Sequence, residues 1–249
     1  PQGFNIHKYP VVEQEGWVWV WLGDADLADT SLIPICKLDA DGLEYRHGVL
    51  NYGANYQLIN DNLCDLSHVA YVHENTLARD ATDWVEREAT YTKVDNGVGV
   101  TRWIVGSQPL PIPGLPERVD IWSSYEFYAP GIMSLLITYY PIGTAEKSNF
   151  GTPDVKQLFA IRTAHAATPA TEKTTNYHFG VSLLADQAPS QEVLDVALTM
   201  VTVAFQEDKV TIEAQQASLD RYPDVVLRNT VHDKALVRIR RLISKKINL

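Results

Sequence analysis

The sequence has few cysteines, no excess of positive charge and no long apolar run. Two cysteines, Cys36 and Cys64, are too few for a disulfide framework, so both are expected as free thiols. Lysine and arginine number 21 against 31 aspartates and glutamates, a net charge of -10 that argues against a nucleic-acid partner. No apolar stretch reaches the roughly 18 residues that cross a bilayer, and no signal peptide is seen. These absences favour a cytoplasmic protein that binds neither nucleic acid nor membrane.

What the sequence does contain is enough apolar material for a large core. Hydrophobic residues make up 45% of the 249, which allows one sizeable domain or a domain with a fragment. In segment 11–23, tryptophans alternate with aliphatic residues after a turn at Glu15-Gly16, which predicts a strand buried on both faces. Residues 23–43 are expected to be a connection. Because the chain opens on proline in the approach to this strand, we expect it to begin inside a larger protein.

Most of the remaining chain shows strand patterns, with three helical segments. The helices are expected at about 58–78, 190–219 and 232–246. The proline-rich segment 108–116 cannot pair regularly, so we expect a loop that is either a surface connection or the border of a pocket. Seven runs rich in β-branched and aromatic residues predict antiparallel strands: 44–52, 84–93, 98–106, 118–128, 131–140, 156–165 and 174–184. The sequence therefore predicts an α+β domain with helices on one face of an antiparallel sheet.

One short segment carries a metal-binding pattern. Asn62, Asp65, His68 and His73 form N-x-x-D-x-x-H-x-x-x-x-H. Two histidines and one carboxylate are the ligands of non-haem Fe(II) oxygenases, which leave positions open for dioxygen and substrate. Positions five apart are rotated by about 140° on a regular helix, so the helix must bulge or end near 69–72. Asp65 is three residues before His68, a spacing that predicts a carboxylate accepting a hydrogen bond from that imidazole.

The third ligand must come from elsewhere in the chain, and segment 190–219 offers three candidates. Apolar residues recur as a stripe along one face of the expected helix at intervals of four, three and four residues. The next interval of four places Asp208 on the same face. Glu207 and Glu213 are the rivals, although Glu207 continues a row displaced from the centre of the stripe. Spacing alone favours Asp208 and leaves both rivals open. The stripe consists of Val193, Ala197, Met200 and Ala204.

With these residues identified, the chain resembles the terminal oxygenase component of Rieske non-haem iron oxygenases, especially the vanillate and dicamba O-demethylases. The shared segments are 60–73 and 207–215, and 9–19 is similar to the end of the family's Rieske domain. The resemblance implies that His68, His73 and Asp208 bind a mononuclear Fe(II). It also implies that Asn62 lies near the metal and that Asp65 connects it to the cluster of a neighbouring subunit in a homotrimer.

The resemblance implies a fold and two domains. We expect residues 1–35 to be the C-terminal remnant of a Rieske [2Fe–2S] domain and 36–249 to be the catalytic iron domain. The catalytic domain is expected to be a helix-grip fold of the START and Bet v 1 type, an antiparallel sheet with a long C-terminal helix. The family's cluster requires C-x-H and C-x-x-H, and this sequence has neither. The cluster is therefore expected only in a missing N-terminal part.

The implied function is O2-dependent oxidation of a small aromatic substrate by a monooxygenase, with electrons supplied by a ferredoxin or reductase. O-demethylation is the leading hypothesis. Ring or alkyl hydroxylation and a non-catalytic ligand-binding module are the alternatives. His165 is expected either to contact the substrate or to lie in the core, and Ser134, Asn176 and His178 are weaker candidates for substrate contact.

Overall fold

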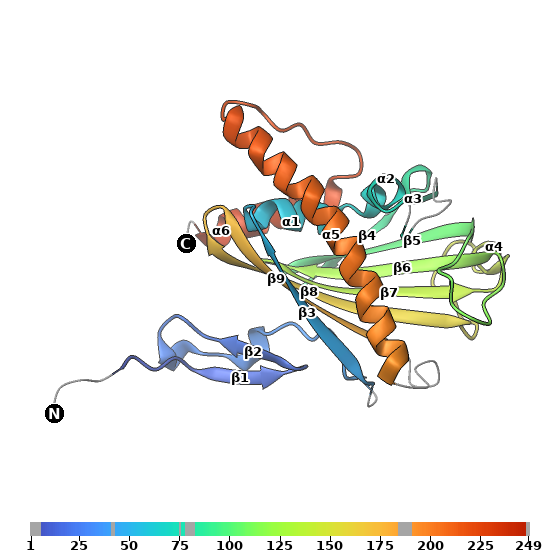
Figure 1. The fold of residues 1–249 in the computed structure, drawn as a ribbon, viewed down its shortest axis with the longest axis horizontal. Helices are drawn as coiled ribbons and strands as arrows, with labels where there is room; N and C mark the ends of the chain where they lie inside the picture. The colour runs from blue at the N-terminus through green and yellow to red at the C-terminus, as the bar shows by residue number, and fades with distance from the viewer. Residues whose placement is uncertain (1–5, 41–42, 75, 78–82, 184–190, 248–249) are drawn as a thin grey trace.

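The computed structural model describes residues 6–40, 43–74, 76–77, 83–183 and 191–247. In these residues a seven-stranded antiparallel sheet has the strand order β3-β9-β8-β7-β6-β5-β4 (Figure 1). Its strands are β3 (Tyr45–Tyr52), β4 (Thr90–Val94), β5 (Gly97–Ser107), β6 (Val119–Tyr128), β7 (Ile132–Tyr140), β8 (Phe159–Thr171) and β9 (Thr174–Leu183). The predicted antiparallel sheet of an α+β domain is confirmed.

Helices cover one face of this sheet. The long helix α5 (Gln191–Arg221) crosses the sheet and contacts β3 and β9 (Figure 1). Helix α1 (Tyr56–Cys64) contacts α5 and β8, and α6 (Lys234–Ile247) contacts α1 and β5. Two further helices, α2 (Val69–Val72) and α3 (Asp83–Glu86), are short, as is α4 (Thr144–Lys147). In the described part of the chain, no helix combines the length and apolar character needed to span a bilayer.

The core lies between the sheet and its helices. Inward side chains of the central strands, such as Phe127, Met133 and Phe179, pack in one buried cluster with Phe205 and Ile212 of α5. Burying this many large apolar side chains stabilises each by about 1.5–3 kcal/mol relative to exposure. The packing holds α5 against the sheet, as the helix-grip prediction requires.

One predicted strand is partly a helix. Residues 84–93 were expected to be extended, but 83–86 form α3 and the strand begins at Thr90. Trp84 is buried, and its carbonyl oxygen accepts a hydrogen bond from the Arg102 guanidinium. Such tertiary contacts override the strand preference of the local sequence.

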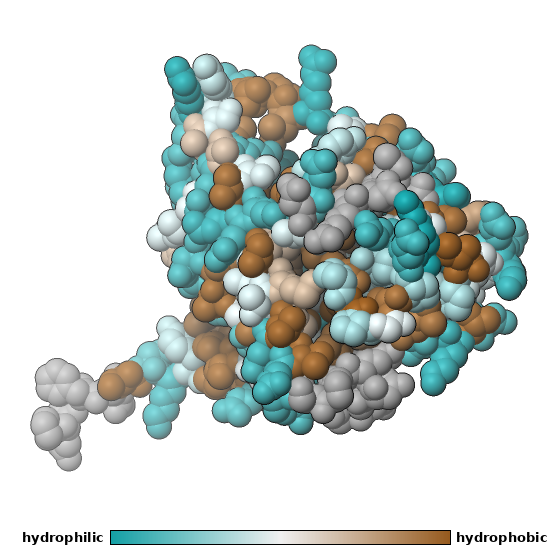
Figure 2. Space-filling model, turned by 45° about the vertical axis from the view of Figure 1, so that its right-hand side comes forward, coloured by the Kyte–Doolittle hydropathy of each residue, from teal (hydrophilic) through white to brown (hydrophobic). Residues whose placement is uncertain are grey.

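A separate two-stranded sheet precedes the main domain. It consists of β1 (Val11–Gln14) and β2 (Trp17–Val20), followed by the 3-10 turns η1 (Ala25–Leu27) and η2 (Thr30–Leu32). The tryptophan face of β2 is half-buried, whereas Val18 is 64% and Val20 50% exposed. The expectation of a strand buried on both faces is therefore wrong, because no second layer among the described residues covers the aliphatic face. Apolar residues are exposed among hydrophilic ones on the face shown in Figure 2 as well.

Three hydrogen bonds, two of them buried, attach the hairpin to the main domain. The Glu15 carboxylate is buried and accepts hydrogen bonds from the backbone N–H groups of Cys36 at 2.8 Å and Leu38 at 3.1 Å. The indole N–H of Trp17 donates to His47 Nδ1 on β3 at 2.9 Å. The hairpin is therefore held by these polar groups together with the packing of Trp17 against a buried apolar cluster that contains Cys36 and Leu38.

We expect Glu15→Gln to loosen the hairpin. Glutamine is neutral and offers one acceptor oxygen, so both backbone N–H groups lose the charged acceptor and one of them is left without any acceptor, at a cost of about 1–3 kcal/mol. Hydrogen exchange of the Cys36 and Leu38 amides should accelerate by about tenfold or more, while exchange in β6 stays unchanged. Glu13→Gln, on the exposed side of β1, is the matched control. Unchanged exchange at both amides in Glu15→Gln would show that the carboxylate does not hold the hairpin.

Candidate metal centre

The predicted interruption of the first helical segment takes the form of two helix ends. Helix α1 ends at Cys64, and Asp65 leaves the helical conformation with φ -120° and ψ 89°. The 3-10 turn η4 (Leu66–His68) and α2 follow, and α2 ends at Val72, so that His73 has φ -109° and ψ 25°. This backbone path brings the two imidazole rings together, with their centroids 5.4 Å apart.

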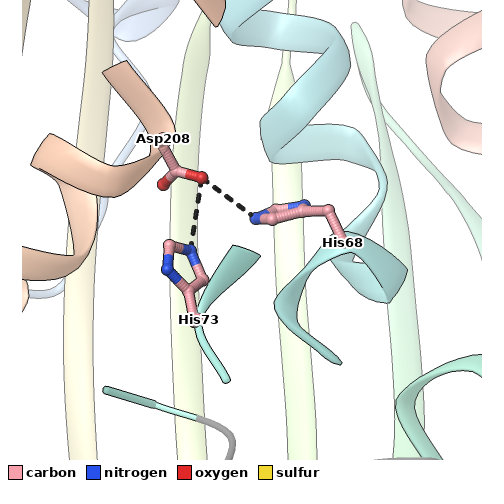
Figure 3. Close-up of side chains that lie close together, drawn as sticks. All are labelled: His68, His73 and Asp208. Carbon is pink, nitrogen blue, oxygen red and sulfur yellow. Dashed lines mark ion pairs between the residues drawn. The ribbon is translucent and has the colours of Figure 1, made fainter. Parts of the chain in front are cut away.

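Asp208 of α5 faces both rings. Its Oδ1 lies 3.4 Å from Nε2 of His68 and 3.2 Å from Nε2 of His73 (Figure 3). One ligand atom from each of the three residues lies within 4.8 Å of the others. The rival carboxylates point elsewhere, since Glu207 contacts Nδ1 of His73 and Glu213 binds Lys209 and the Gly53 N–H. Of the three candidates, Asp208 is thus the one placed to complete the set.

Hydrogen bonds on the far side of each ring define which nitrogen faces Asp208. Nδ1–H of His68 donates to the Asp65 carbonyl oxygen at 2.5 Å, and Nδ1–H of His73 donates to the Glu207 carboxylate at 2.8 Å. In neutral rings the Nε2 lone pairs then point towards a carboxylate oxygen. The two Nε2 atoms and the Asp208 oxygen are then three hydrogen-bond acceptors directed at one point. Protons or a cation must therefore lie between them. Two imidazoles and one carboxylate fit a non-haem iron ion.

The predicted role of the Asp65 side chain in orienting His68 is wrong in one respect. The imidazole donates to the backbone carbonyl of Asp65, and the carboxylate is used locally. It accepts hydrogen bonds from Ser67 N at 2.9 Å and Ser67 Oγ at 2.8 Å, which caps η4. The cause is the helix end at Cys64, because leaving the helix turns the Asp65 carbonyl, and not its side chain, towards the ring.

Burial and charge set the protonation states of the three residues. Burial lowers the pKa of His68, and the Asp208 charge only partly opposes this. Burial also acts to lower the pKa of His73, but hydrogen bonds to Asp208 and Glu207 outweigh it and raise the pKa. For Asp208, burial favours the neutral acid, yet the hydrogen bond with His73 and the nearby His68 lower the pKa overall. The carboxylate is therefore anionic at neutral pH, as a metal ligand must be.

Asn62 is placed to position that carboxylate. Its Nδ2–H donates to Asp208 Oδ1 at 3.1 Å, and this bond also contributes to the lowered pKa of Asp208. The side chain is half-buried on the last turn of α1 and lines the cavity beside the cluster. The structure thus brings Asn62 to the same carboxylate that faces the two histidines.

An apolar cavity opens beside the cluster. It has a volume of about 120 Å³, and its walls carry the three clustered residues and mostly aliphatic and aromatic side chains. A larger space of about 450 Å³ adjoins it and shares the wall residues Leu77, Leu110, Ile161 and Val201. The proline-rich segment 108–116 supplies Leu110, Pro111, Ile112 and Pro113 to the larger space, so this loop borders a pocket.

One of the four predicted substrate residues reaches the cavity. His165 lines it, on the inward face of β8. Ser134, Asn176 and His178 lie on the opposite face of the sheet, because Met133 and Leu135 of β7 and Tyr177 and Phe179 of β9 occupy the inward positions. Ser134 Oγ donates to the Cys36 carbonyl, and Asn176 accepts from Asn51. The prediction of substrate contact is therefore not supported for these three residues.

Two residues of the site were not predicted from the sequence: Thr163, and Glu207 as a partner of His73. Glu207 was considered only as a rival ligand, yet it accepts hydrogen bonds from His73 at 2.8 Å and from Thr76 at 2.7 Å. Thr163 lines the cavity two residues before His165, on the same face of β8. Because side chains alternate between the two faces of a strand, the placement of His165 in the cavity could have predicted Thr163. No local pattern links Glu207 to His73.

We expect Glu207→Gln to weaken metal binding without abolishing it. The amide can still accept from Nδ1–H of His73, but it removes the negative charge that supports the ring as a ligand. Loss of a hydrogen-bond partner of a metal-binding histidine typically lowers metal affinity by about 10- to 100-fold. Fe(II) affinity should be measured anaerobically by calorimetry, with the neighbouring exposed Gln206→Ala as control. An affinity equal to that of the unmodified chain would remove Glu207 from the centre.

Fold and site together define a helix-grip domain with a two-histidine, one-carboxylate cluster at the end of an apolar cavity. Residues 52–249 match the family model of the vanillate O-demethylase oxygenase C-terminal domain, and the chain belongs to this family. It is 32% identical to the toluene-4-sulfonate monooxygenase system iron-sulfur subunit of Comamonas testosteroni, over 88% of this chain and 64% of that protein. The identity to the dicamba O-demethylase oxygenase component of Stenotrophomonas maltophilia is also 32%, over 98% and 71%.

Solved structures agree with this assignment. Dicamba monooxygenase bound to 3,6-dichlorosalicylic acid superposes with a TM-score of 0.83 at 28% identity, over 98% of this chain and 71% of that one. The same enzyme with non-haem iron and dicamba gives a TM-score of 0.66 at 27% identity, over 95% and 67%. The chain thus spans about two thirds of the length of the relatives it matches.

Proposed function

We propose that this chain is the catalytic part of a Rieske-type terminal oxygenase that binds one Fe(II) ion through His68, His73 and Asp208. The observation that carries the proposal is the convergence of two imidazole Nε2 atoms and one carboxylate oxygen beside an apolar cavity. The relatives named as oxygenases, one with non-haem iron in its structure, support the same assignment. Asn62 and Asp65 complete the proposed machinery.

Each residue has a distinct task in this proposal. The ion supplies dioxygen activation when it is bound. Glu207 and the Asp65 carbonyl hold the Nδ1 protons and so keep both Nε2 atoms available as ligands. Asn62 fixes the Asp208 carboxylate, and the aliphatic walls exclude water and hold an aromatic ring.

The proposed reaction is O-demethylation of a methoxyarene. Dioxygen, two electrons and two protons convert the methyl C–H to C–OH and release one water. The resulting hemiacetal loses its C–O bond to give formaldehyde and a phenol. The electrons would come from a ferredoxin or reductase, with Asp65 on the route to the centre, and we propose a cytoplasmic homotrimer.

The domain proposal assigns residues 1–35 to the end of a Rieske [2Fe–2S] domain and 36–249 to the catalytic domain. The separate hairpin sheet with its exposed aliphatic face supports this division. The cysteines of this chain do not fit such a cluster. Cys36 and Cys64 are both buried in different apolar clusters, and burial raises the pKa of each thiol. Cluster ligands would therefore come from residues outside this sequence.

Metal and product analysis together test this function. Protein prepared anaerobically with Fe(II) should hold about one iron per chain, and the complete oxygenase with its electron donor should release formaldehyde from methoxyarenes in proportion to phenol. Hydroxylated product that keeps its methoxy group would favour ring or alkyl hydroxylation. Absence of bound iron would favour the non-catalytic ligand-binding alternative and contradict the proposal.

A further inference from the structure

The charges around the cavity disfavour an anionic substrate. Among the described residues that line it and the adjoining space, the acidic side chains are Asp208 and the exposed Glu192, and no lysine or arginine is present. A divalent ion would add two positive charges, but Asp208 and Glu207 carry one negative charge each on either side of His73. The centre is then formally neutral, and no described positive group is left to pair with a substrate carboxylate.

Besides Asn62, which binds Asp208, and Tyr139, which hydrogen-bonds to the Leu110 backbone, the cavity wall offers a neutral hydrogen-bonded group of three side chains. His165 is 2% exposed, and its Nδ1 lies 2.6 Å from the Tyr177 hydroxyl while its Nε2 lies 2.8 Å from Thr163 Oγ1. Burial lowers the pKa of His165 to about 3, with the Asp208 charge opposing, so the ring is neutral at pH 7. Both ring nitrogens are thus engaged within the protein, which argues against direct hydrogen bonding of His165 to a substrate.

Within this hydrogen-bonded group, the Thr163 hydroxyl is the part that can still bind a ligand. If Tyr177 donates to Nδ1, the ring donates from Nε2 to Thr163, whose own proton is free to reach a substrate oxygen. With the other tautomer, Thr163 donates to Nε2 and its oxygen can accept from a substrate hydroxyl. Across the sheet, Thr163 pairs with the apolar Leu135 and Val181, so the hydroxyl is isolated on an aliphatic wall.

The size of the cavity limits the ligand to one ring. Its volume of about 120 Å³ is close to that of an apolar cavity of about 150 Å³ that holds benzene. Substituents can extend past Leu110 and Val201 into the adjoining space of about 450 Å³. Ring-sized space, mostly apolar walls and the neutral Thr163 hydroxyl describe a small, uncharged aromatic ligand.

We propose that the substrate is a neutral single-ring arene with one hydrogen-bonding oxygen, that Thr163 contacts this oxygen, and that His165 and Tyr177 position the Thr163 hydroxyl. This rests on the proposed function, because it places that substrate beside the metal centre. It names a substrate class and a specificity residue for the same site.

Calorimetric titration of the chain, loaded anaerobically with Fe(II), with three probes tests the proposal. At pH 7, 2-methoxyphenol should bind at least about tenfold more tightly than the anion 2-methoxybenzoate, with toluene as the ligand without oxygen. Thr163→Val should raise the Kd of 2-methoxyphenol by about tenfold, the worth of one hydrogen bond, and leave that of toluene within about twofold. Thr163→Ser, which keeps the hydroxyl, should retain the preference.

Tyr177→Phe tests the positioning role. It should raise the Kd of 2-methoxyphenol by about three- to tenfold without a matching change for toluene. A merely structural role would leave the ratio of the two Kd values unchanged. Equal loss of both ligands in either variant, no binding of 2-methoxyphenol, or equally tight binding of 2-methoxybenzoate would overturn the proposal. Iron content is measured before the titration, so failure to bind Fe(II) would contradict the proposed function, whereas full iron content with tight 2-methoxybenzoate binding would contradict only this inference.

Discussion

Replacing Asp208 by alanine is expected to abolish Fe(II) binding. The carboxylate supplies the single anionic ligand of the cluster, and without it two neutral imidazoles remain. Because even outer partners of a metal site cost about 10- to 100-fold, loss of this ligand should lower Fe(II) affinity by more than about 100-fold. Iron content after anaerobic loading and desalting, measured by elemental analysis, should fall from about one per chain to background.

Glu213→Ala is the matched control for that substitution. Glu213 is on the same helix, but its carboxylate binds Lys209 and the Gly53 N–H and does not face the histidines. It should keep its full iron content. Retention of iron by Asp208→Ala, with the fold intact by circular dichroism, would rule out Asp208 as a ligand.

Asp65→Asn is expected to separate metal binding from turnover. The backbone carbonyl of Asp65 holds His68, so the metal site does not depend on the side-chain charge. Asparagine can also accept from the Ser67 N–H and keep the cap of η4. Iron content should therefore be unchanged, whereas turnover of the complete oxygenase should fall by about 100-fold or more if this carboxylate is on the electron route.

The matched control is Glu74→Gln, which removes an exposed charge next to His73. It should leave both iron content and turnover within about twofold. Normal turnover in Asp65→Asn would remove the electron-transfer role. Loss of iron in that variant would instead show that the side chain supports the metal site, contrary to the hydrogen bonds of the structure.

The sequence was most informative where a local pattern has a single geometric consequence. The impossible spacing of His68 and His73 on one regular helix predicted an interruption, and α2 does end just before His73. The step of four residues that reaches Asp208 likewise identified a carboxylate on the buried stripe of α5. Both predictions needed only helical periodicity.

Predictions that depended on which face of a strand a residue occupies were weaker. Substrate contact was expected of Ser134, Asn176 and His178 because they lie on predicted strands. Strand membership does not say which face a side chain occupies, and a shift of one residue exchanges the two faces. Their inward neighbours form the cavity side, and only the pairing of β7, β8 and β9 reveals this.

Other features depend on contacts between distant segments. The bond from His73 to Glu207 joins residues 134 positions apart. The choice between the carbonyl and the carboxylate of Asp65 depends on where α1 ends. No periodic pattern in the sequence contains this information.

The most direct test of the metal assignment is a crystal structure of the chain loaded anaerobically with Fe(II), with anomalous data at the iron edge. We expect one anomalous peak, about 2 Å from Nε2 of His68, Nε2 of His73 and a carboxylate oxygen of Asp208. A peak bound by other residues, or no peak between these three side chains, would contradict the assignment.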